Sequence, residues 1–152
     1  MKKIKLGGED LDNIRIKVSG CPNSCGQHHI ADIGFFGGAK KVGEHLAPHF
    51  QLMVGGMTDE GKAIFAQPVL KLPAKRIPDA VIKMLELYRK DRTSAKELFR
   101  DFSGRVGIAY WKAALEPYTS LPAYEQTPEA YRDWGADTEF SLGGMGPGEC
   151  AA

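Results

Sequence analysis

The chain has 152 residues, of which 20 are Lys or Arg and 19 are Asp or Glu, and its formal net charge is +1 at pH 7. The length fits a single domain, and the balanced charge gives no support to a nucleic acid or an anionic membrane surface as a partner. Because the sequence has no apolar run of the ~20 residues that span a membrane, no secretory signal behind its basic start and only three cysteines, we expect a cytoplasmic protein without a disulfide framework.

The first predicted strand follows a polar lead-in at the amino terminus. Ile14, Ile16 and Val18 alternate with Arg15 and Lys17, and this two-residue period is typical of a strand with one buried and one solvated face. We therefore expect the three apolar side chains to be buried.

Two cysteines follow this strand on a predicted turn. Cys21 and Cys25 enclose Pro22 and Asn23, which favour turns. Thiolates are the usual ligands of iron–sulfur clusters, which normally have four of them. Residues 23–30 are predicted to form a short helix whose first turn carries Cys25, where backbone N–H groups favour a thiolate. These residues alone leave two interpretations open: ligation of a metal or cluster, or two buried thiols that pack as small apolar groups.

A hairpin and an edge segment are predicted next. Residues 32–36 are predicted to form a second strand, residues 37–41 to interrupt it with a long basic loop, and residues 49–55 to form a third strand. Residues 62–75 contain prolines and are typical of an edge strand or a connector. The residues expected on the buried face of the third strand are Phe50, Leu52 and Val54.

Helical periodicity dominates the next part of the chain. One helix is predicted to begin at Pro78. A second is predicted to open with a capping box at Ser94 and Glu97 and to end at Gly104, before a third short helix over residues 108–115. The residues predicted to be buried on the first two helices are Val81, Leu85, Tyr88, Leu98, Phe99 and Phe102.

This order of elements defines a fold class. Strands followed by helices predict an α+β fold, a mixed sheet with the helices packed on one face. Residues 1–116 would form this unit, and residues 117–152, rich in Pro, Gly and acidic residues, are predicted to be an extended tail that wraps the domain or a partner.

The segment around the cysteines resembles a known signature. Residues 19–35, SGCPNSCGQHHIADIGF, are similar to the second half of the sirohaem/4Fe–4S signature of assimilatory nitrite and sulfite reductases. In that family a Cys-x5-Cys pair is followed many residues later by a Cys-x3-Cys pair, which Cys21 and Cys25 match. The chain contains no Cys-x5-Cys. The resemblance, which continues more loosely to about Ile108, therefore implies the carboxy-terminal piece of a reductase.

The resemblance also implies cofactors for residues 1–116. They would form a half-domain that holds a 4Fe–4S cluster coupled to sirohaem, with Cys21 and Cys25 as cluster ligands and Cys25 also bridging to the sirohaem iron. In the family the cluster passes single electrons to sirohaem during the six-electron reduction of nitrite or sulfite. The residues expected to bind the cofactors are Cys21, Cys25, Asn23, Gly26, Gln27 and His28.

Partners follow from what the chain lacks. A second chain or domain would supply the Cys-x5-Cys pair and the cations that bind the anion, and an electron donor would complete the enzyme. This chain alone would be inactive. No catalytic residue is assigned. The sequence also does not distinguish nitrite from sulfite as the substrate, because the pocket residues that would do so would lie in the missing portion.

The histidines and the basic residues near the cysteines each have two interpretations. His28 and His29 have a spacing from the cysteines that suits zinc, or one of them packs in the fold and the other lines a cofactor pocket. A basic and glycine-rich set would either bind the carboxylates of sirohaem or form a solvated loop; it comprises Arg15, Lys17, Gly37, Gly38, Lys40 and Lys41. His45 and His49 flank Pro48 at the start of a predicted strand and are expected to be surface or hairpin residues.

A non-catalytic function is the alternative hypothesis. The chain would then be a metal-binding or thiol-relay module, with zinc or iron at Cys21 and Cys25 and thiol exchange through Cys150, which follows a glycine-rich run. Cys150 would equally suit a chain end without a role.

Overall fold

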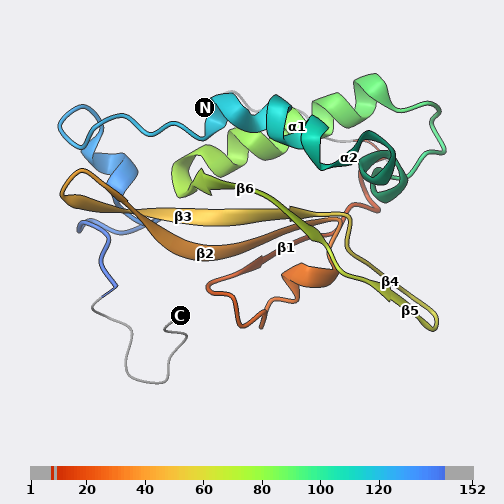
Figure 1. Ribbon diagram of the computed structural model, residues 1–152, viewed down its shortest axis with the longest axis horizontal. Coiled ribbons are helices and arrows are strands. Elements are labelled where there is room, and N and C mark those ends of the chain that lie inside the picture. The colour runs from red at the N-terminus through yellow and green to blue at the C-terminus, as the bar shows by residue number, and fades with distance from the viewer. Residues whose placement is uncertain (1–7, 9, 143–152) are drawn as a thin grey trace.

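The computed structural model describes residue 8 and residues 10–142. Its main sheet has four strands in the order β1-β2-β3-β6, and both long helices cover one face of that sheet (Figure 1). The predicted α+β class, with strands followed by helices on one face, is confirmed. The elements of the two layers are β1 (Ile16–Ser19), β2 (Ile33–Val42), β3 (His45–Val54), β6 (Gln67–Pro73), α1 (Ile77–Asp91) and α2 (Phe99–Leu115).

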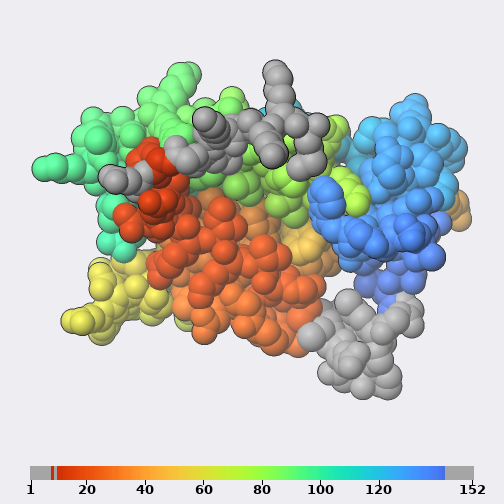
Figure 2. All heavy atoms as spheres, turned by 180° about the vertical axis from the view of Figure 1, so that it is seen from behind, coloured from red at the N-terminus to blue at the C-terminus, as the bar shows by residue number. Residues whose placement is uncertain are grey.

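Smaller elements complete the fold. β4 (Met57–Asp59) and β5 (Lys62–Ile64) form a separate two-stranded hairpin, which projects from the body (Figure 2). Short 3-10 helices occupy His28–Ile30, Ala74–Arg76, Glu116–Tyr118 and Pro128–Tyr131. In the part of the chain that the structure describes, no helix is long and apolar enough to cross a membrane.

The hairpin of β2 and β3 is longer than predicted. β2 pairs antiparallel with β3 along its whole length, so residues 37–41 do not interrupt the strand. The prediction of a long basic loop is wrong because Gly43 and Glu44 alone make the turn, and Gly43 has the positive φ of 61° that such two-residue turns favour. Lys40 and Lys41 are therefore strand residues.

The core lies between the sheet and the helices. Ile33 and Phe35 of β2 pair with Val54 and Leu52 of β3, and all of these side chains are at most 2% exposed. The core is completed by apolar and aromatic residues of the two helices. The predicted buried positions are confirmed for Leu52, Val54, Leu85, Tyr88, Phe99 and Phe102, whereas Leu98 is 37% exposed.

β1 is present as predicted, but its apolar side chains are not buried. Ile16 is 45% exposed and Val18 is 55% exposed. They pair with Ile33 and Phe35 in a parallel ladder, so they face the same side as the core residues. β1 is the outermost strand of the sheet, and the helix layer leaves it uncovered. Alternation in the sequence predicted the strand but could not show that the described residues leave about half of Ile16 and Val18 exposed.

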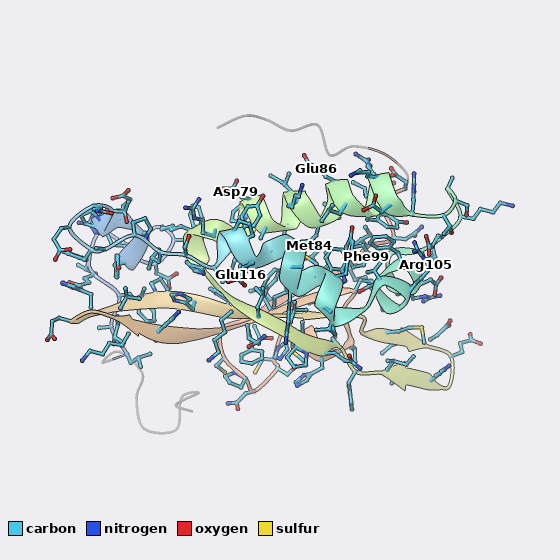
Figure 3. The ribbon with its side chains drawn as sticks, turned by 45° about the horizontal axis from the view of Figure 1, so that its top comes forward. Asp79, Met84, Glu86, Phe99, Arg105 and Glu116 are labelled. Carbon is cyan, nitrogen blue, oxygen red and sulfur yellow. The ribbon has the colours of Figure 1, made fainter. Side chains whose placement is uncertain are left out.

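α1 begins and packs as the sequence predicts. Pro78 lies in its first turn, where the missing N–H leaves no intrahelical bond unmade. Figure 3 shows Met84 directed toward the sheet and Asp79 and Glu86 on the outer side of the helix. The amphipathic pattern of α1 therefore determines which of its faces meets the sheet.

α2 begins later than predicted. Its first residue is Phe99, because the Glu97 carboxylate does not close a capping box with Ser94. It accepts hydrogen bonds from the backbone N–H of Thr93 (2.6 Å) and from Nε of Arg105 (2.7 Å). The side chain that was expected to cap the helix thus ties the preceding loop to the helix surface.

α2 also continues past its predicted end. Gly104 does not stop it, but the helical backbone is interrupted at Gly107, with φ 78° and ψ 172°, and a second helical part then runs to Leu115. Glycine adopts this left-handed conformation at little cost. The predicted third helix over residues 108–115 is the second part of α2.

We expect the contacts of Glu97 to make stability depend on acid pH. Hydrogen bonds from Arg105 and Thr93 lower the pKa of Glu97 from 4.5 to about 2. Since the folded-state pKa is the lower one, this stabilisation is fully present above about pH 4.5 and is lost as the pH falls toward about 2. In urea unfolding, Glu97→Gln should be less stable than the wild type at pH 7 and should approach it near pH 2. A difference that stays constant over this range would contradict the assignment.

The described part of the tail, residues 117–142, folds over one end of the sheet. Tyr131 is fully buried and packs with Ala47 of β3, and its hydroxyl donates to the carbonyl of Pro122 (2.8 Å). Trp134 Nε1 donates to the carbonyl of Ala74 (3.2 Å). Figure 2 shows these residues gathered at the end of the molecule opposite the β4–β5 hairpin.

Candidate functional site

The cysteine turn (residues 20–27) leads to the face of the sheet opposite the helices. Gly34 points to this side because it alternates with the core residues Ile33 and Phe35. A Cβ at Gly34 would lie only 2.2 Å from the carbonyl oxygen of His28. The chain that follows the turn therefore packs directly on β2, and Figure 1 shows it on one side of the sheet with the helices on the other.

The two cysteines of the turn differ in exposure. Cys21 is 7% exposed, Cys25 is exposed, and both are free thiols. The predicted helix over residues 23–30 is wrong, because Ser24 and Gln27 have φ values of 61° and 58° and left-handed residues interrupt an α-helix. Cys25 thus does not lie at an α-helix amino terminus. The turn leaves Cys25 exposed at the surface, and no helix dipole acts on its thiol.

Ser19, the last residue of β1, holds the turn in place. It is 4% exposed, and its Oγ accepts a hydrogen bond from the backbone N–H of Gly26 (3.1 Å) and lies 2.8 Å from Nδ1 of His28. A Cβ at Gly26 would lie 2.3 Å from the carbonyl oxygen of Val18. The close approach of Gly26 to β1 therefore fixes the backbone next to Cys25.

The two histidines after the turn are stacked on each other. Their ring centroids are 4.2 Å apart, and Nδ1 of His29 is hydrogen-bonded to Oγ of Ser24. His28 is 1% exposed, and burial, with a smaller contribution from His29, lowers the pKa of His28. No set of three His, Cys, Asp or Glu side chains suited to a metal ion occurs within the described residues. The zinc interpretation therefore finds no third ligand there, and Cys150 lies outside them.

Two of the predicted basic residues serve the local structure. Arg15 Nε lies 3.2 Å from Oδ2 of Asp32, which is buried, and Lys17 Nζ donates to Oε1 of Gln27 (2.6 Å). These contacts join β1 to the segment that precedes β2 and to the cysteine turn. Asn23 is exposed. The predicted basic residues therefore lie in two places: Arg15 and Lys17 contact the segments around the cysteine turn, whereas Lys40 and Lys41 lie on β2.

A cavity of about 160 Å³ lies beside the cysteine turn. A Cβ at Gly38 would meet no atom within 4 Å, so the floor of the cavity is open at this position. Since residues 36, 38, 49 and 51 share a face of the paired strands β2 and β3, the cavity lies on the face opposite the core. Its lining includes Pro22, Phe36, Gly38, His49, Gln51 and Lys71.

His49 lines this cavity; it lies on β3 of the β2–β3 hairpin, one of its two expected placements, and the alternative of a surface residue is wrong. It is 3% exposed, and its Nδ1 lies 3.0 Å from the carbonyl oxygen of Ala47. Burial is the main cause that lowers the pKa of His49, the Ala47 carbonyl opposes it, and Lys40 and Lys71 lower it further. Sequence reasoning missed this group together with Gln51. Strand alternation places His49 and Gln51 on one face, but only the pairing of β3 with β6 brings Lys71 to them.

Two larger cavities, of about 500 Å³ and about 360 Å³, lie elsewhere. The first lies between the β4–β5 hairpin and α2 and is lined by Phe65, Arg100 and Gly107 among others. The second cavity is lined by Asp32 and Tyr88 among others. None of these three cavities is lined by a cysteine, and Pro22 is the residue of the cysteine turn that lines the smallest one.

The residues of the turn fit part of an iron–sulfur site. Two thiols, a group that can ligate iron, lie four positions apart, and one of them is exposed. Nε2 of His28 is buried without a hydrogen-bond partner among the described residues, and a cation, Lys71, borders the adjacent cavity. This donor set suits a group that carries sulfur and negative charge.

Three comparisons relate the chain to known proteins. The family model for the nitrite and sulphite reductase 4Fe-4S domain matches residues 12–123. The chain is 33% identical over 135 residues to the assimilatory ferredoxin-dependent nitrite reductase of Haloferax mediterranei, covering 86% of this chain and 23% of that protein. It is 34% identical over 106 residues to the NADPH sulfite reductase hemoprotein beta-component of Dickeya chrysanthemi, covering 70% and 17%.

A solved structure supports the same relationship. The NirA protein of Mycobacterium tuberculosis matches with a TM-score of 0.58 and 29% sequence identity, over 64% of this chain and 18% of that one. The chain thus spans less than a quarter of the length of these relatives.

Proposed function

Because the chain belongs to the nitrite and sulphite reductase 4Fe-4S domain family, we propose that it is the cluster-side segment of a sirohaem-dependent nitrite or sulfite reductase. The observation that carries this proposal is the placement of Cys25. Cys25 is exposed on a turn that Ser19 holds through Gly26, and Pro22 of the same turn lines a cavity bordered by Lys71 and His49. A ligand at the surface of a fixed turn is suited to a cluster that is shared with another segment.

The residues of this chain would divide the work of holding the cofactors. Cys21 and Cys25 would ligate the 4Fe–4S cluster, and Cys25 would also contact the sirohaem iron, as the family signature implies. The other residues expected to bind the cofactors are Asn23, Gly26, Gln27 and His28. When bound, the cluster and sirohaem supply the electron-transfer chemistry, while the protein orients them and tunes their potentials.

The cavity near the turn suits the acidic edge of a sirohaem. Lys71 borders it and Lys40 acts on the same His49 imidazole, so a carboxylate placed there would pair with a cation. Gly38 lies in its lining and a Cβ there would meet no atom within 4 Å, so the absence of a side chain allows a flat group to approach the strand. These residues would orient the cofactor and exclude water from one side of it.

The proposed function requires partners. A 4Fe–4S cluster normally has four thiolates, and we propose that another segment or chain supplies two of them as a Cys-x5-Cys pair, together with cations for the anionic substrate. An electron donor is required as well. Ferredoxin and NADPH appear in the names of the relatives, and we propose an external electron donor for the complete enzyme, with nitrite or sulfite as substrate.

Reconstitution with iron tests the proposal without the unidentified partner. The chain is incubated anaerobically with ferrous iron, sulfide and excess dithiothreitol, whose thiols can take the remaining ligand positions. We expect a brown protein with about four iron atoms per chain, the content of one cluster. Cys25→Ser should lose at least nine-tenths of this iron.

A matched control uses the cysteine outside the described residues. Cys150→Ser keeps Cys21 and Cys25, and it should bind as much iron as the wild type. If Cys25→Ser retained the full iron content, the cluster proposal would be wrong. If Cys150→Ser lost the iron instead, the alternative of a module that depends on Cys150 would be favoured.

A further inference from the structure

His28 combines deep burial with a polar atom that has no partner. The side chain is 1% exposed, and its Nδ1 lies 2.8 Å from Oγ of Ser19. Its other ring nitrogen, Nε2, is buried and has no hydrogen-bond partner among the described residues. A buried donor or acceptor that stays unpaired is costly. A partner from outside the described residues would remove this cost.

The hydrogen bonds of Ser19 indicate which nitrogen of His28 carries the proton. A serine hydroxyl offers one O–H donor and two lone pairs. The backbone N–H of Gly26 already donates to Ser19 Oγ (3.1 Å), and within the described residues the hydroxyl has no acceptor other than His28 Nδ1. If the hydroxyl donates to Nδ1, both the donor and the acceptor of Ser19 are satisfied, and the imidazole proton lies on Nε2, which has no acceptor among the described residues.

The opposite tautomer is less consistent with the structure. If Nδ1 carried the proton, the Ser19 hydroxyl would lose its only acceptor among the described residues, and Nε2 would still lack a partner. A doubly protonated ring would place an unpaired cation in a buried site beside His29, and both burial and this neighbour lower the pKa of His28. A neutral ring with the proton on Nε2 remains.

We propose that His28 donates a hydrogen bond from Nε2–H to an anionic acceptor of the cofactor group held at the cysteine turn, and that Ser19 is the positioning residue that sets this tautomer. The acceptor is either a sulfur of the iron–sulfur cluster or a carboxylate of sirohaem. This inference rests on the proposed function, because the cysteine turn must hold the cofactor. It assigns to Ser19 two tasks, since the same oxygen anchors Gly26 next to Cys25 and orients His28.

The first test needs no cofactor. Nitrogen NMR of the ¹⁵N-histidine-labelled chain distinguishes the two neutral tautomers from their couplings to the ring protons. We expect His28 to carry its proton on Nε2, and we expect Ser19→Ala to reduce this preference. The Ser24–His29 pair provides a control, because Ser24→Gly should alter His29 and leave the tautomer of His28 unchanged. A proton on Nδ1 of His28 in the wild-type chain would overturn the inference.

The second test uses protein reconstituted with iron, sulfide and dithiothreitol, with and without sirohaem. Hydrogen bonds to cluster sulfurs raise the reduction potential. If the acceptor is a sulfur, His28→Leu should lower the potential enough to change the ratio of oxidised to reduced cluster about tenfold, which is about 59 mV for one electron. His28→Gln keeps an N–H donor and should restore part of the shift.

The sirohaem arm identifies a carboxylate acceptor. In that case the cluster potential stays unchanged, and His28→Leu weakens sirohaem binding about tenfold. His29→Leu is the matched control and should leave both quantities near the wild-type values. If the chain loads iron but His28→Leu behaves like His29→Leu in both arms, the inference fails and the proposed function stands. If no iron is loaded by the wild type, the proposed function fails first.

Discussion

Gly26→Ala is expected to destabilise the chain by about 3 kcal/mol and to prevent cluster assembly, although it adds only one methyl group. The new Cβ would lie 2.3 Å from the carbonyl oxygen of Val18 and 2.9 Å from Oγ of Ser19. The first contact is with backbone, so relief requires β1 and the cysteine turn to separate, and overpacking of this kind costs about 1–3 kcal/mol. Separation would also break the hydrogen bond from Gly26 to Ser19 (3.1 Å) and displace the adjacent Cys25.

Urea unfolding and iron content after reconstitution measure the two effects of Gly26→Ala. Gly20→Ala is the matched control in the same turn, because its Cβ would meet no atom within 4 Å. We expect Gly20→Ala to change the free energy of unfolding by less than about 0.5 kcal/mol and to bind iron as the wild type does. Equal losses in both variants would show that the turn tolerates an added methyl group at neither glycine, and the specific role of Gly26 would be rejected.

Trp111→Ala should produce the largest loss of stability in the chain, about 4 kcal/mol. Trp111 is fully buried and its ring packs on Phe99 and Phe102, with centroids 5.7 Å away in each case. Its Nε1 donates to Oγ of Ser103 (2.8 Å), which is also buried. The substitution thus leaves a large cavity and a buried hydroxyl without its donor.

The second tryptophan of the chain is the control for this experiment. Trp134 is 61% exposed and contacts the body through a hydrogen bond to the carbonyl of Ala74 and through Lys75, whose Nζ is 4.2 Å from the ring centroid. Trp134→Ala should therefore cost no more than about 1 kcal/mol. Unfolding in urea followed by circular dichroism compares the two variants. A loss below about 2 kcal/mol for Trp111→Ala would show that the core repacks around the missing ring.

Local patterns predicted most elements of the fold. The period of the apolar residues, with Pro78 at its start, predicted α1, and alternation predicted the core face of β3 at Leu52 and Val54. Predictions failed where a residue or segment that suited one local structure was held in another by a contact with a different part of the chain. Glu97 has the spacing of a capping box, but Arg105, eight residues away, takes its carboxylate. Residues 37–41 look like a break, yet a complete ladder with β3 keeps them extended.

The candidate site was predictable only in its ligands. The two thiols and their spacing are visible in the sequence, and so is the histidine pair. The exposure of Cys25 was not visible, because it depends on left-handed residues at Ser24 and Gln27. Lys71 could not be associated with Gln51 either, since the two residues meet through the pairing of β3 with β6.

The sequence by itself determined two features of this protein: two soft thiols at a spacing that one turn can hold, and the apolar periods of a sheet with helices on one face. The tertiary structure decided which other residues are buried near the cysteine turn and which of them contact one another. It buried His28 and left its Nε2 without a partner in the described residues, joined Ser19 to Gly26, and placed His49 beside Lys71. The reason is physical. Spacing along the chain sets local geometry, whereas burial and neighbours are set by strand pairing and by close backbone contacts between segments far apart in the sequence.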